Sequence, residues 1–590
     1  MDNQRNILLA VLMCGLLLLA WDAGIRYFYP ESEAPVAAAS KEDTPSERAA
    51  QQMQGGSLSN EGAIAREVDL ATELGGSDRV RIQAPQISGS INPVGARIDD
   101  VTLTAFRQDT AKDSGPIQLF APEGTAIQQY ARFGWLVNGQ LATDGSTPWQ
   151  VEGGPLTPST PVTLRHTDAA GRDYAIRIAV DDDFLFTITQ TIVNRGSSGL
   201  VVQPYGSIAR TSATASADIW NAHSGPISGS AEAVDYDLDY DDLAEMGEDR
   251  VADNPQWFGF TDIYWLSALV RDDDAPAQAT FRALSPDLFR ADLIYDPVTL
   301  APGQTEVRTT RLFAGAKESS VLDAYQAKGI GLFGKAIDWG WFEWFEKPML
   351  WLLRQFNALV GNFGVAIILL TLLIRLVLFP IAQKQFHSMA AMKAIQPKMK
   401  ALQERYKEDK PKLQQEMMAL YKKEGVNPAA GCLPILIQIP IFFALYKVLI
   451  LAIEMRHEKF LWIRDLSAPD PATILNLFGL LPFTPPSFLG IGILAVLLGI
   501  TMWMTFRLNP SQLDPMQQQI FNIMPWVLMF VMAPFAAGLL LYWVTNNLLT
   551  LAQQTYLYSK NPELRAAAEA EKAEKARAAE REKAEKAEKA

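Results

Sequence analysis

Long apolar runs with almost no charge restrict the fold of this sequence more than any other feature. The longest, residues 515–559, contains 45 consecutive residues without Asp, Glu, Lys or Arg. About 20 apolar helical residues cross the hydrocarbon core of a membrane. Because Pro and Gly at 533–538 interrupt the run, and these residues break helices, we expect two membrane-spanning helices here.

Three further internal runs are long enough to span a membrane. The first contains a single charge, Arg375, the second contains only Lys447, and the third contains none. These runs comprise residues 361–382, 432–453 and 489–506. Together with an N-terminal apolar run, they bring the predicted number of spans to six.

The distribution of charge predicts the orientation of these spans. The N-terminal run, residues 7–25, is expected to be an uncleaved signal anchor, because the small residues at 37–39 lie too far beyond its apolar core for cleavage. Loop 383–430 carries ten Lys and Arg and is therefore predicted to stay in the cytoplasm. Six spans then place both termini in the cytoplasm and residues 31–330 outside.

The region outside is acidic and has the pattern of β-structure. Residues 31–330 hold 43 Asp and Glu against 22 Lys and Arg, which excludes a basic nucleic-acid surface. From about 75 to 318, apolar and polar residues alternate, as at 174–180, and turn clusters separate the runs. This pattern predicts an all-β sandwich. The acidic run 235–249 lacks the spacing of a calcium loop, so we expect a solvated loop there rather than a cation site.

Two segments near the spans are predicted to be amphipathic helices. Residues 322–358 combine many aromatic with charged residues, which favours a helix lying in the membrane interface; packing on the β-domain is the alternative. Loop 383–430 is predicted to form a helical hairpin of arms 384–408 and 412–424. Flexible methionines recur along it and form either a contact surface for apolar substrates or the seam between the arms. They are Met389, Met392, Met399, Met417 and Met418.

Polar side chains inside the predicted spans indicate the candidate functional site. An Arg at mid-span costs about 2.5–3.5 kcal/mol, and no Asp or Glu lies inside the last five spans to pair with Arg375. Bonding between helices accounts for the uncharged residues, but it explains Arg375 poorly, and a hydrated cavity explains such a cation better. The expected lining comprises Thr371, Gln438, Thr501, Tyr542, Trp543, Asn546 and Thr550.

Several short segments, together with Arg375 and an anchor followed by a β-domain, carry a resemblance to a known family. They are QEMMALY at 415–421, NPAAGCLP at 427–434, QIPIF at 438–442, LWIRDL at 461–466, DPMQQ at 514–518 and GLLLYW at 538–543. The sequence resembles the YidC/Oxa/Alb family of membrane protein insertases, most closely its Gram-negative bacterial members, over about 340–558. It departs from them in an apolar, Pro-rich insert at 475–487.

The resemblance implies a five-helix core with a hydrophilic groove, open to cytoplasm and lipid, in which Arg375 receives the polar flank of an incoming chain. It implies substrate recruitment by the hairpin and a β-supersandwich in the periplasm. The implied partners are nascent membrane proteins, the Sec translocon with its accessory subunits and the lipid bilayer, with the ribosome and the signal-recognition-particle receptor as further candidates. The resemblance implies that the protein is a chaperone and insertase of the bacterial inner membrane. It implies that the protein is not an enzyme and has no catalytic residues, cofactor, metal or recognition of nucleic-acid sequence.

The predicted organisation follows in chain order. It comprises a signal-anchor helix at 1–28, a linker at 29–74, the periplasmic β-supersandwich at 75–320, periplasmic and interfacial amphipathic helices at 321–358, transmembrane helix 359–382, the cytoplasmic hairpin at 383–430, transmembrane helix 431–454, a periplasmic loop at 455–487, transmembrane helix 488–507, a cytoplasmic loop at 508–515, transmembrane helices 516–533 and 538–558, and a charged cytoplasmic tail at 559–590.

Two other classes of protein are alternatives. A small-solute transporter would also need a polar cavity, but it should show repeats among its spans, and we find none. A sugar-binding or epimerase module tethered by the spans would use the histidines of the β-region, His166 and His223. Such a tether would not need five further spans and an intramembrane Arg. Removal of the β-domain distinguishes the two alternatives. An insertase should keep most of its activity without this domain, whereas a tethered sugar-binding or epimerase module should lose all of it.

Overall fold

The computed structural model describes most of the chain between residues 68 and 560. Its gaps are residues 77, 112, 217–221, 253, 384–394, 396–397, 400, 407–408, 426–432, 479–480, 482–489 and 509–514. The predicted signal anchor, most of the linker and the tail beyond residue 560 lie outside the described residues.

The region between residues 80 and 316 consists mainly of β-strands. They are β1 Val80–Gln83, β2 Ile87–Asn92, β3 Arg97–Arg107, β4 Pro116–Phe120, β5 Gln129–Val137, β6 Gln140–Leu141, β7 Gln150–Glu152, β8 Val162–Thr167, β9 Arg172–Val180, β10 Leu185–Asn194, β11 Leu200–Thr211, β12 Gly225–Gly229, β13 Val234–Asp235, β14 Glu248–Arg250, β15 Trp257–Thr261, β16 Trp265–Arg271, β17 Ala277–Ser285, β18 Leu288–Tyr295, β19 Val298–Leu300 and β20 Thr305–Ala316.

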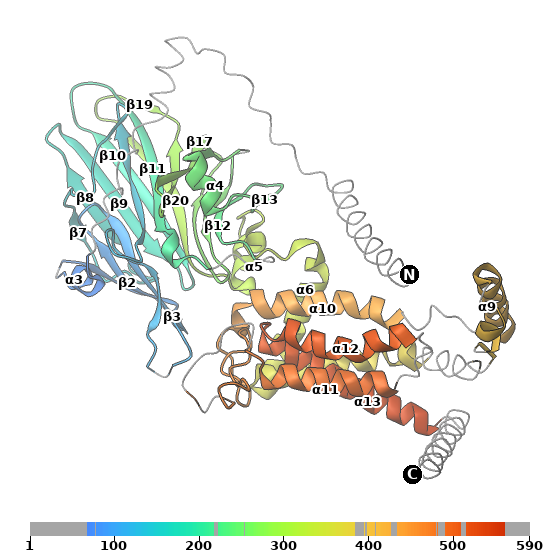
Figure 1. The fold of residues 1–590 in the computed structure, drawn as a ribbon. Helices are drawn as coiled ribbons and strands as arrows, with labels where there is room; N and C mark the ends of the chain where they lie inside the picture. The colour runs from blue at the N-terminus through green and yellow to red at the C-terminus, as the bar shows by residue number, and fades with distance from the viewer. Residues whose placement is uncertain are drawn as a thin grey trace. The chain divides into compact units, whose positions relative to one another are not determined.

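These strands form two antiparallel sheets that pack face to face (Figure 1). One sheet has the order β1-β2-β3-β5-β11-β18-β17-β14, with β4 beside β3 and β19 beside β11. The other has the order β13-β12-β15-β16-β20-β10-β9-β8-β7. The predicted all-β sandwich is therefore confirmed.

Alternating burial along the strands explains why this region folds as a sandwich. Every second residue of β10 is buried, and Ile188 of β10 lies opposite Ile178 of β9 on one side and Thr310 of β20 on the other. Such alternation turns one face of a sheet to the core and the other to solvent. β5 and β18, in contrast, are buried along their whole length.

Short helices accompany the sandwich: α3 Leu70–Leu74, α4 Tyr240–Met246 and α5 Ser319–Ala327. The solvated loop expected across the acidic run 235–249 is wrong, because α4 and β14 lie within it. Asp239 accepts a hydrogen bond from the backbone of Asp242 and so caps α4, while Tyr240 and Leu243 bury the inner face of the helix. Local capping and two apolar anchors thus outweigh the mutual repulsion of the acids.

The remaining helices are α6 Glu343–Val360, α7 Phe363–Val377, α9 Lys410–Glu424, α10 Leu433–Leu451, α11 Ile493–Leu508, α12 Pro515–Met532 and α13 Ala537–Lys560. α13 packs against α7, α10 and α11, and α11 also packs against α12 (Figure 1). α7 begins where the Asn362 side chain accepts a hydrogen bond from the Val365 amide. Its buried residues, among them Ile367, Leu370 and Thr371, recur at helical spacing and form one stripe toward its neighbours.

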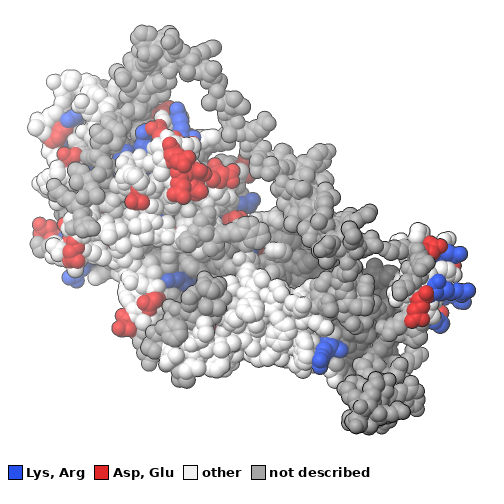
Figure 2. All heavy atoms as spheres, in the orientation of Figure 1, with Lys and Arg blue, Asp and Glu red and all other residues white. Residues whose placement is uncertain are grey.

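None of the described helices combines the length and the apolar composition that a membrane crossing requires. On the face drawn in Figure 2, the described surface of the helices α10 to α13 is nearly free of charge. Acidic and basic side chains gather instead over the β-sandwich and over α9 (Figure 2).

α6 is amphipathic. It buries Met349, Leu350 and Leu353, and it packs against α7 and α10. Its other face exposes tryptophans: Trp344 is 71% and Trp351 is 59% exposed. A membrane interface would cover such a face, and that location stays a prediction.

Candidate functional site

Arg375 lies in the last turn of α7 and is held by α13. Its Nε donates a hydrogen bond of 2.7 Å to Oδ1 of Asn546, and one Nη lies 3.5 Å from the Asn546 carbonyl oxygen. Arg375 is half-buried, whereas Asn546 is buried. Of the residues that the structure describes, no Asp or Glu forms an ion pair with Arg375. Its guanidinium charge is therefore bound by a neutral amide.

The stripe on α13 joins this arginine to a second polar contact. Tyr542, Asn546 and Thr550 follow each other at intervals of four residues and so share one helix face. One turn before Asn546, the Tyr542 hydroxyl accepts a hydrogen bond from Nε2 of Gln438 on α10. One turn after it, the Thr550 hydroxyl donates to the Asn546 carbonyl oxygen at 2.7 Å. Polar side chains of α7, α10 and α13 thus meet along one stripe.

The threonines expected in the lining use their hydroxyls elsewhere. Thr371 lies one turn before Arg375, but its hydroxyl donates to the Ile367 carbonyl oxygen of its own helix at 2.7 Å. Thr501 of α11 likewise donates within its helix, and it accepts a 3.2 Å hydrogen bond from Nδ2 of Asn547. The bond between Asn547 and Thr501 joins two helices, whereas the bond of Thr371 stays within α7.

Trp543 does not share the polar stripe. Its ring packs on Phe442 of α10, with 5.1 Å between the ring centroids. The sequence reasoning grouped Trp543 with the lining because it neighbours Tyr542, but successive residues of a helix point about 100° apart.

The hairpin methionines divide into two groups. Met399 is buried with Ile395, and Met417 of α9 packs against this pair, so both methionines contribute to the seam. Met418 is 60% exposed. Met389 and Met392 lie outside the described residues. On α9, Met417 thus packs in the seam, while the next residue, Met418, is exposed.

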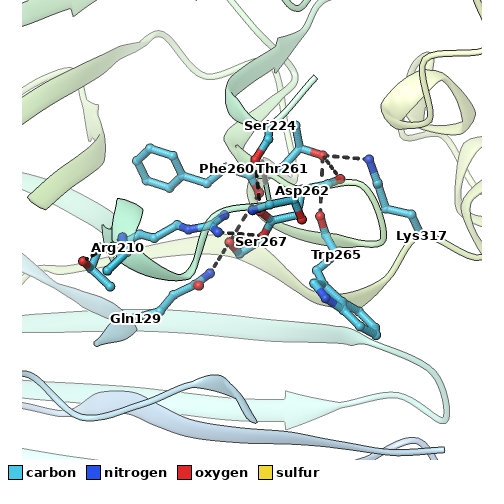
Figure 3. Close-up of polar contacts among 12 residues, drawn as sticks. Gln129, Arg210, Ser224, Phe260, Thr261, Asp262, Trp265, Ser267 and Lys317 are labelled. Atoms are coloured by element: carbon cyan, nitrogen blue, oxygen red, sulfur yellow. Dashed lines mark hydrogen bonds and ion pairs between the residues drawn. The ribbon is translucent and has the colours of Figure 1, made fainter. Parts of the chain in front are cut away.

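Sequence reasoning missed a buried charge network in the β-sandwich (Figure 3). Arg210 of β11 forms an ion pair of 2.7 Å with Asp262, which follows β15 in the opposite sheet. Asp262 also accepts hydrogen bonds from the Ser216 amide at 2.8 Å and the Ser224 hydroxyl at 3.1 Å. These residues are dispersed over 50 positions without a motif, so only the packing of the sheets reveals them.

Lys317 extends this network from the sandwich toward α6. Its Nζ donates to the Thr261 hydroxyl at 3.0 Å (Figure 3). It also donates to the Ala336 carbonyl oxygen at 3.3 Å. Burial lowers the pKa of Lys317 to about 8, against the attraction of Asp262 and Asp338. Lys447 of α10 donates to the Asp338 carbonyl oxygen at 2.9 Å. Two lysines therefore hold the segment that leads into α6.

The two histidines that a sugar-binding or epimerase module would use form structural contacts, and so does a glycine-rich stretch that partly resembles a phosphate-binding loop. His166 and His223 contact the backbone carbonyl oxygens of Pro148 and Pro226, at 3.2 and 2.7 Å. In the glycine-rich stretch 329–336, the Gly331 amide donates to the Gln256 side chain at 2.8 Å. Within the described part of the chain, no group of three or more His, Cys, Asp or Glu is arranged to hold a metal ion.

Comparisons with known proteins cover both the β-sandwich and the helices. The family model described as "YidC periplasmic domain" matches residues 79–352, and the one described as "60Kd inner membrane protein" matches residues 355–564. The chain is 40% identical to the membrane protein insertase YidC of Zymomonas mobilis over 95% of its own length and 97% of that protein. It is 42% identical to the protein of that name from Nitrobacter hamburgensis, over 95% and 96% of the two chains.

A crystal structure described as an active YidC insertase matches 87% of the chain and 98% of its own length, at 17% identity and a TM-score of 0.35. The family models and the extent of the sequence identity decide the assignment. The chain belongs to the YidC family of membrane protein insertases.

Proposed function

We propose that this chain inserts newly made proteins into the bacterial inner membrane and helps them fold, alone or with the Sec translocon, through a hydrophilic groove centred on Arg375. One observation carries the proposal: Arg375 is bound by the amide of Asn546 and by no carboxylate among the described residues. A guanidinium that keeps its charge can attract an acidic group of a substrate.

The mechanism needs no chemical energy source. Placing about 20 apolar residues in lipid is favourable, so the polar flank of the incoming segment presents the barrier. A hydrated groove would shorten the dry path of that flank, and Arg375 would attract its acidic residues. A membrane potential that is positive outside would draw the same residues outward. Gln438, Tyr542, Asn546 and Thr550 would form the polar lining.

The proposed setting keeps the six spans, with both termini in the cytoplasm and the β-domain in the periplasm. The partners would be nascent membrane proteins, the Sec translocon with its accessory subunits and the bilayer, with the ribosome and the signal-recognition-particle receptor at the cytoplasmic side. The hairpin would recruit substrates, and exposed Met418 is the described methionine best placed to contact them. On the face drawn in Figure 2, the described surface of α10 to α13 is nearly free of charge, which supports this setting because lipid would face such a surface.

Reconstitution of the purified chain into liposomes tests the proposal. A short two-span membrane protein is synthesised in their presence, and added protease then digests whatever has not crossed the bilayer. We expect the translocated loop to be protected in liposomes that contain the chain and digested with empty liposomes. Equal digestion in both would contradict autonomous insertion.

Arg375→Glu tests the electrostatic part of the proposal in the same assay. The substituted carboxylate would repel an acidic flank, so we expect less protection of a substrate with acidic residues in its translocated loop. Equal protection by the variant and the parent would show that the charge of Arg375 does not act on the substrate.

A further inference from the structure

The contact between Arg375 and Asn546 uses one edge of the guanidinium. Nε donates to the amide oxygen at 2.7 Å, and Nη1 forms no hydrogen bond with any described residue. A guanidinium carries five N–H donors in a rigid fork, so fixing the Nε edge also fixes the direction of the others. Donors therefore remain for a further acceptor.

We propose that Asn546 is a positioning residue for Arg375. Its neutral side-chain oxygen holds the guanidinium, so that the remaining N–H groups and the full charge of Arg375 are available to a carboxylate of the substrate. This inference rests on the proposed function. A carboxylate in place of the amide would form an ion pair and cancel the charge on which that function depends. An apolar residue would leave the long Arg375 side chain without a fixed direction.

The part of α13 that carries the acceptor is buried and is tied to a neighbouring helix. Asn546 is 7% exposed, and the Thr550 hydroxyl binds its carbonyl oxygen. One turn earlier, the Tyr542 hydroxyl accepts a hydrogen bond from Gln438 and so ties α13 to α10. A rigid neighbour is what a positioning residue requires, because a mobile acceptor would move with the arginine.

The test measures discrimination rather than activity alone. The liposome assay uses two substrates that differ at only two positions of the translocated loop. The acidic substrate has Asp at both positions, and the neutral substrate has Asn. The readout is the ratio of the protected fractions of the acidic and the neutral substrate. A substitution that only weakens the fold lowers both fractions together and leaves this ratio unchanged.

Three single variants are compared with the parent. We expect Asn546→Leu to lower the ratio by about tenfold, as for the loss of one hydrogen bond to a charged group. We expect Asn546→Asp, which keeps the shape of the side chain, to bring the ratio to about one, because the ion pair removes the preference for an acid. The matched control Asn547→Leu removes the adjacent amide, which contacts Thr501 and neither Arg375 nor the Asn546 side chain, and should leave the ratio at the value of the parent.

A double variant shows whether Asn546 acts through Arg375. In an Arg375→Ala background, Asn546→Leu should change the ratio no further. A ratio in Asn546→Leu and Asn546→Asp equal to that of the parent would overturn the positioning role while leaving the proposed function intact. A parent that protects both substrates equally would overturn both the electrostatic function and the positioning role, and a parent that protects neither would overturn insertion itself.

Discussion

At the scale of single residues, the ion pair between Arg210 and Asp262 is a buried charge contact that joins the two sheets of the β-sandwich. The two side chains are 2% and 5% exposed and come from opposite sheets. Breaking a buried pair on one side leaves an uncompensated charge, which costs about 3–5 kcal/mol. We therefore expect Asp262→Asn to lower the free energy of unfolding of the β-sandwich by that amount, measured by denaturant titration of tryptophan fluorescence in the full chain.

The exposed pair of Arg165 and Glu152 supplies the control for this prediction. Its partners are 54% and 56% exposed, and such a pair contributes at most about 1 kcal/mol. Glu152→Gln should therefore leave the unfolding midpoint nearly unchanged. If both substitutions had the same small effect, the hydrogen bonds from Ser216 and Ser224 would suffice to hold the segment without the charge of Asp262.

At the scale of elements, α6 carries a carboxyl group that is sensitive to pH. Glu346 is 1% exposed, and burial raises its pKa to about 8, against the attraction of Lys447. Between pH 4.5 and about 8 the folded protein then binds more protons than the unfolded chain. Its stability therefore falls as the pH rises, by at most about 1.36 kcal/mol per pH unit.

Glu346→Gln removes this titration and keeps the shape of the side chain. We expect the thermal unfolding midpoint of the variant to exceed that of the parent by an amount that grows from pH 5 to pH 8. Glu343→Gln on the same helix is the control, because Glu343 forms a partly exposed pair with Lys347. A difference between Glu346→Gln and the parent that stays constant with pH would contradict the prediction.

The cap of α9 tests whether the hairpin depends on local signals. Asp409 accepts a hydrogen bond of 3.1 Å from the Lys412 amide. Its loss in Asp409→Ala should cost about 0.5–2 kcal/mol of helix stability, visible as faster hydrogen–deuterium exchange across 410–424. Asp409→Asn keeps a capping oxygen and should exchange at nearly the rate of the parent. Equal rates in all three proteins would show that packing with Met399, rather than the cap, maintains α9.

The elements also show which parts of the fold a sequence can reveal. β10 was predictable because one face meets the core and the other meets solvent, which leaves an alternating pattern. β5 and β18 are buried on both faces and therefore show no alternating pattern. Their buried Arg132 and Arg290 accordingly could not be recognised as core residues from the neighbouring sequence. α9 begins at Lys410, two residues before the predicted arm, because a helix tolerates Pro411 in its first turn.

The candidate site was predictable to the same limited extent. Helical spacing places Tyr542, Asn546 and Thr550 on one stripe, which needs no knowledge of tertiary structure. The pairing of Arg375 with Asn546, and of Thr501 with Asn547, depends on how α7 and α11 pack against α13. The membrane location of these helices stays a prediction.

At the scale of the whole molecule, polar contacts join the β-sandwich to the segment before α6 and to Arg456 after α10, which donates to the carbonyl oxygens of Arg107 and Gln108. The segment before α6 receives hydrogen bonds from Trp257 at the Gly331 carbonyl oxygen and from Lys317 at that of Ala336. The buried face of α6, in contrast, packs against α7 and α10. The contacts that hold Arg375 lie wholly among helices.

Removal of the β-sandwich, residues 75–316, should therefore leave insertion largely intact. The polar stripe on α13 and its partners on α7 and α10 would keep their contacts. The segment before α6 would lose its bonds to Gln256 and Trp257, and Arg456 would lose those to the carbonyl oxygens of Arg107 and Gln108. We expect protection of the two-span substrate in liposomes to fall by less than about tenfold, equivalent to 1.4 kcal/mol. If the truncated chain gave no protection, and Asp262→Asn in the full chain were also inactive, the activity would instead be assigned to the sandwich. Both changes affect the sandwich, and neither touches the contacts of Arg375.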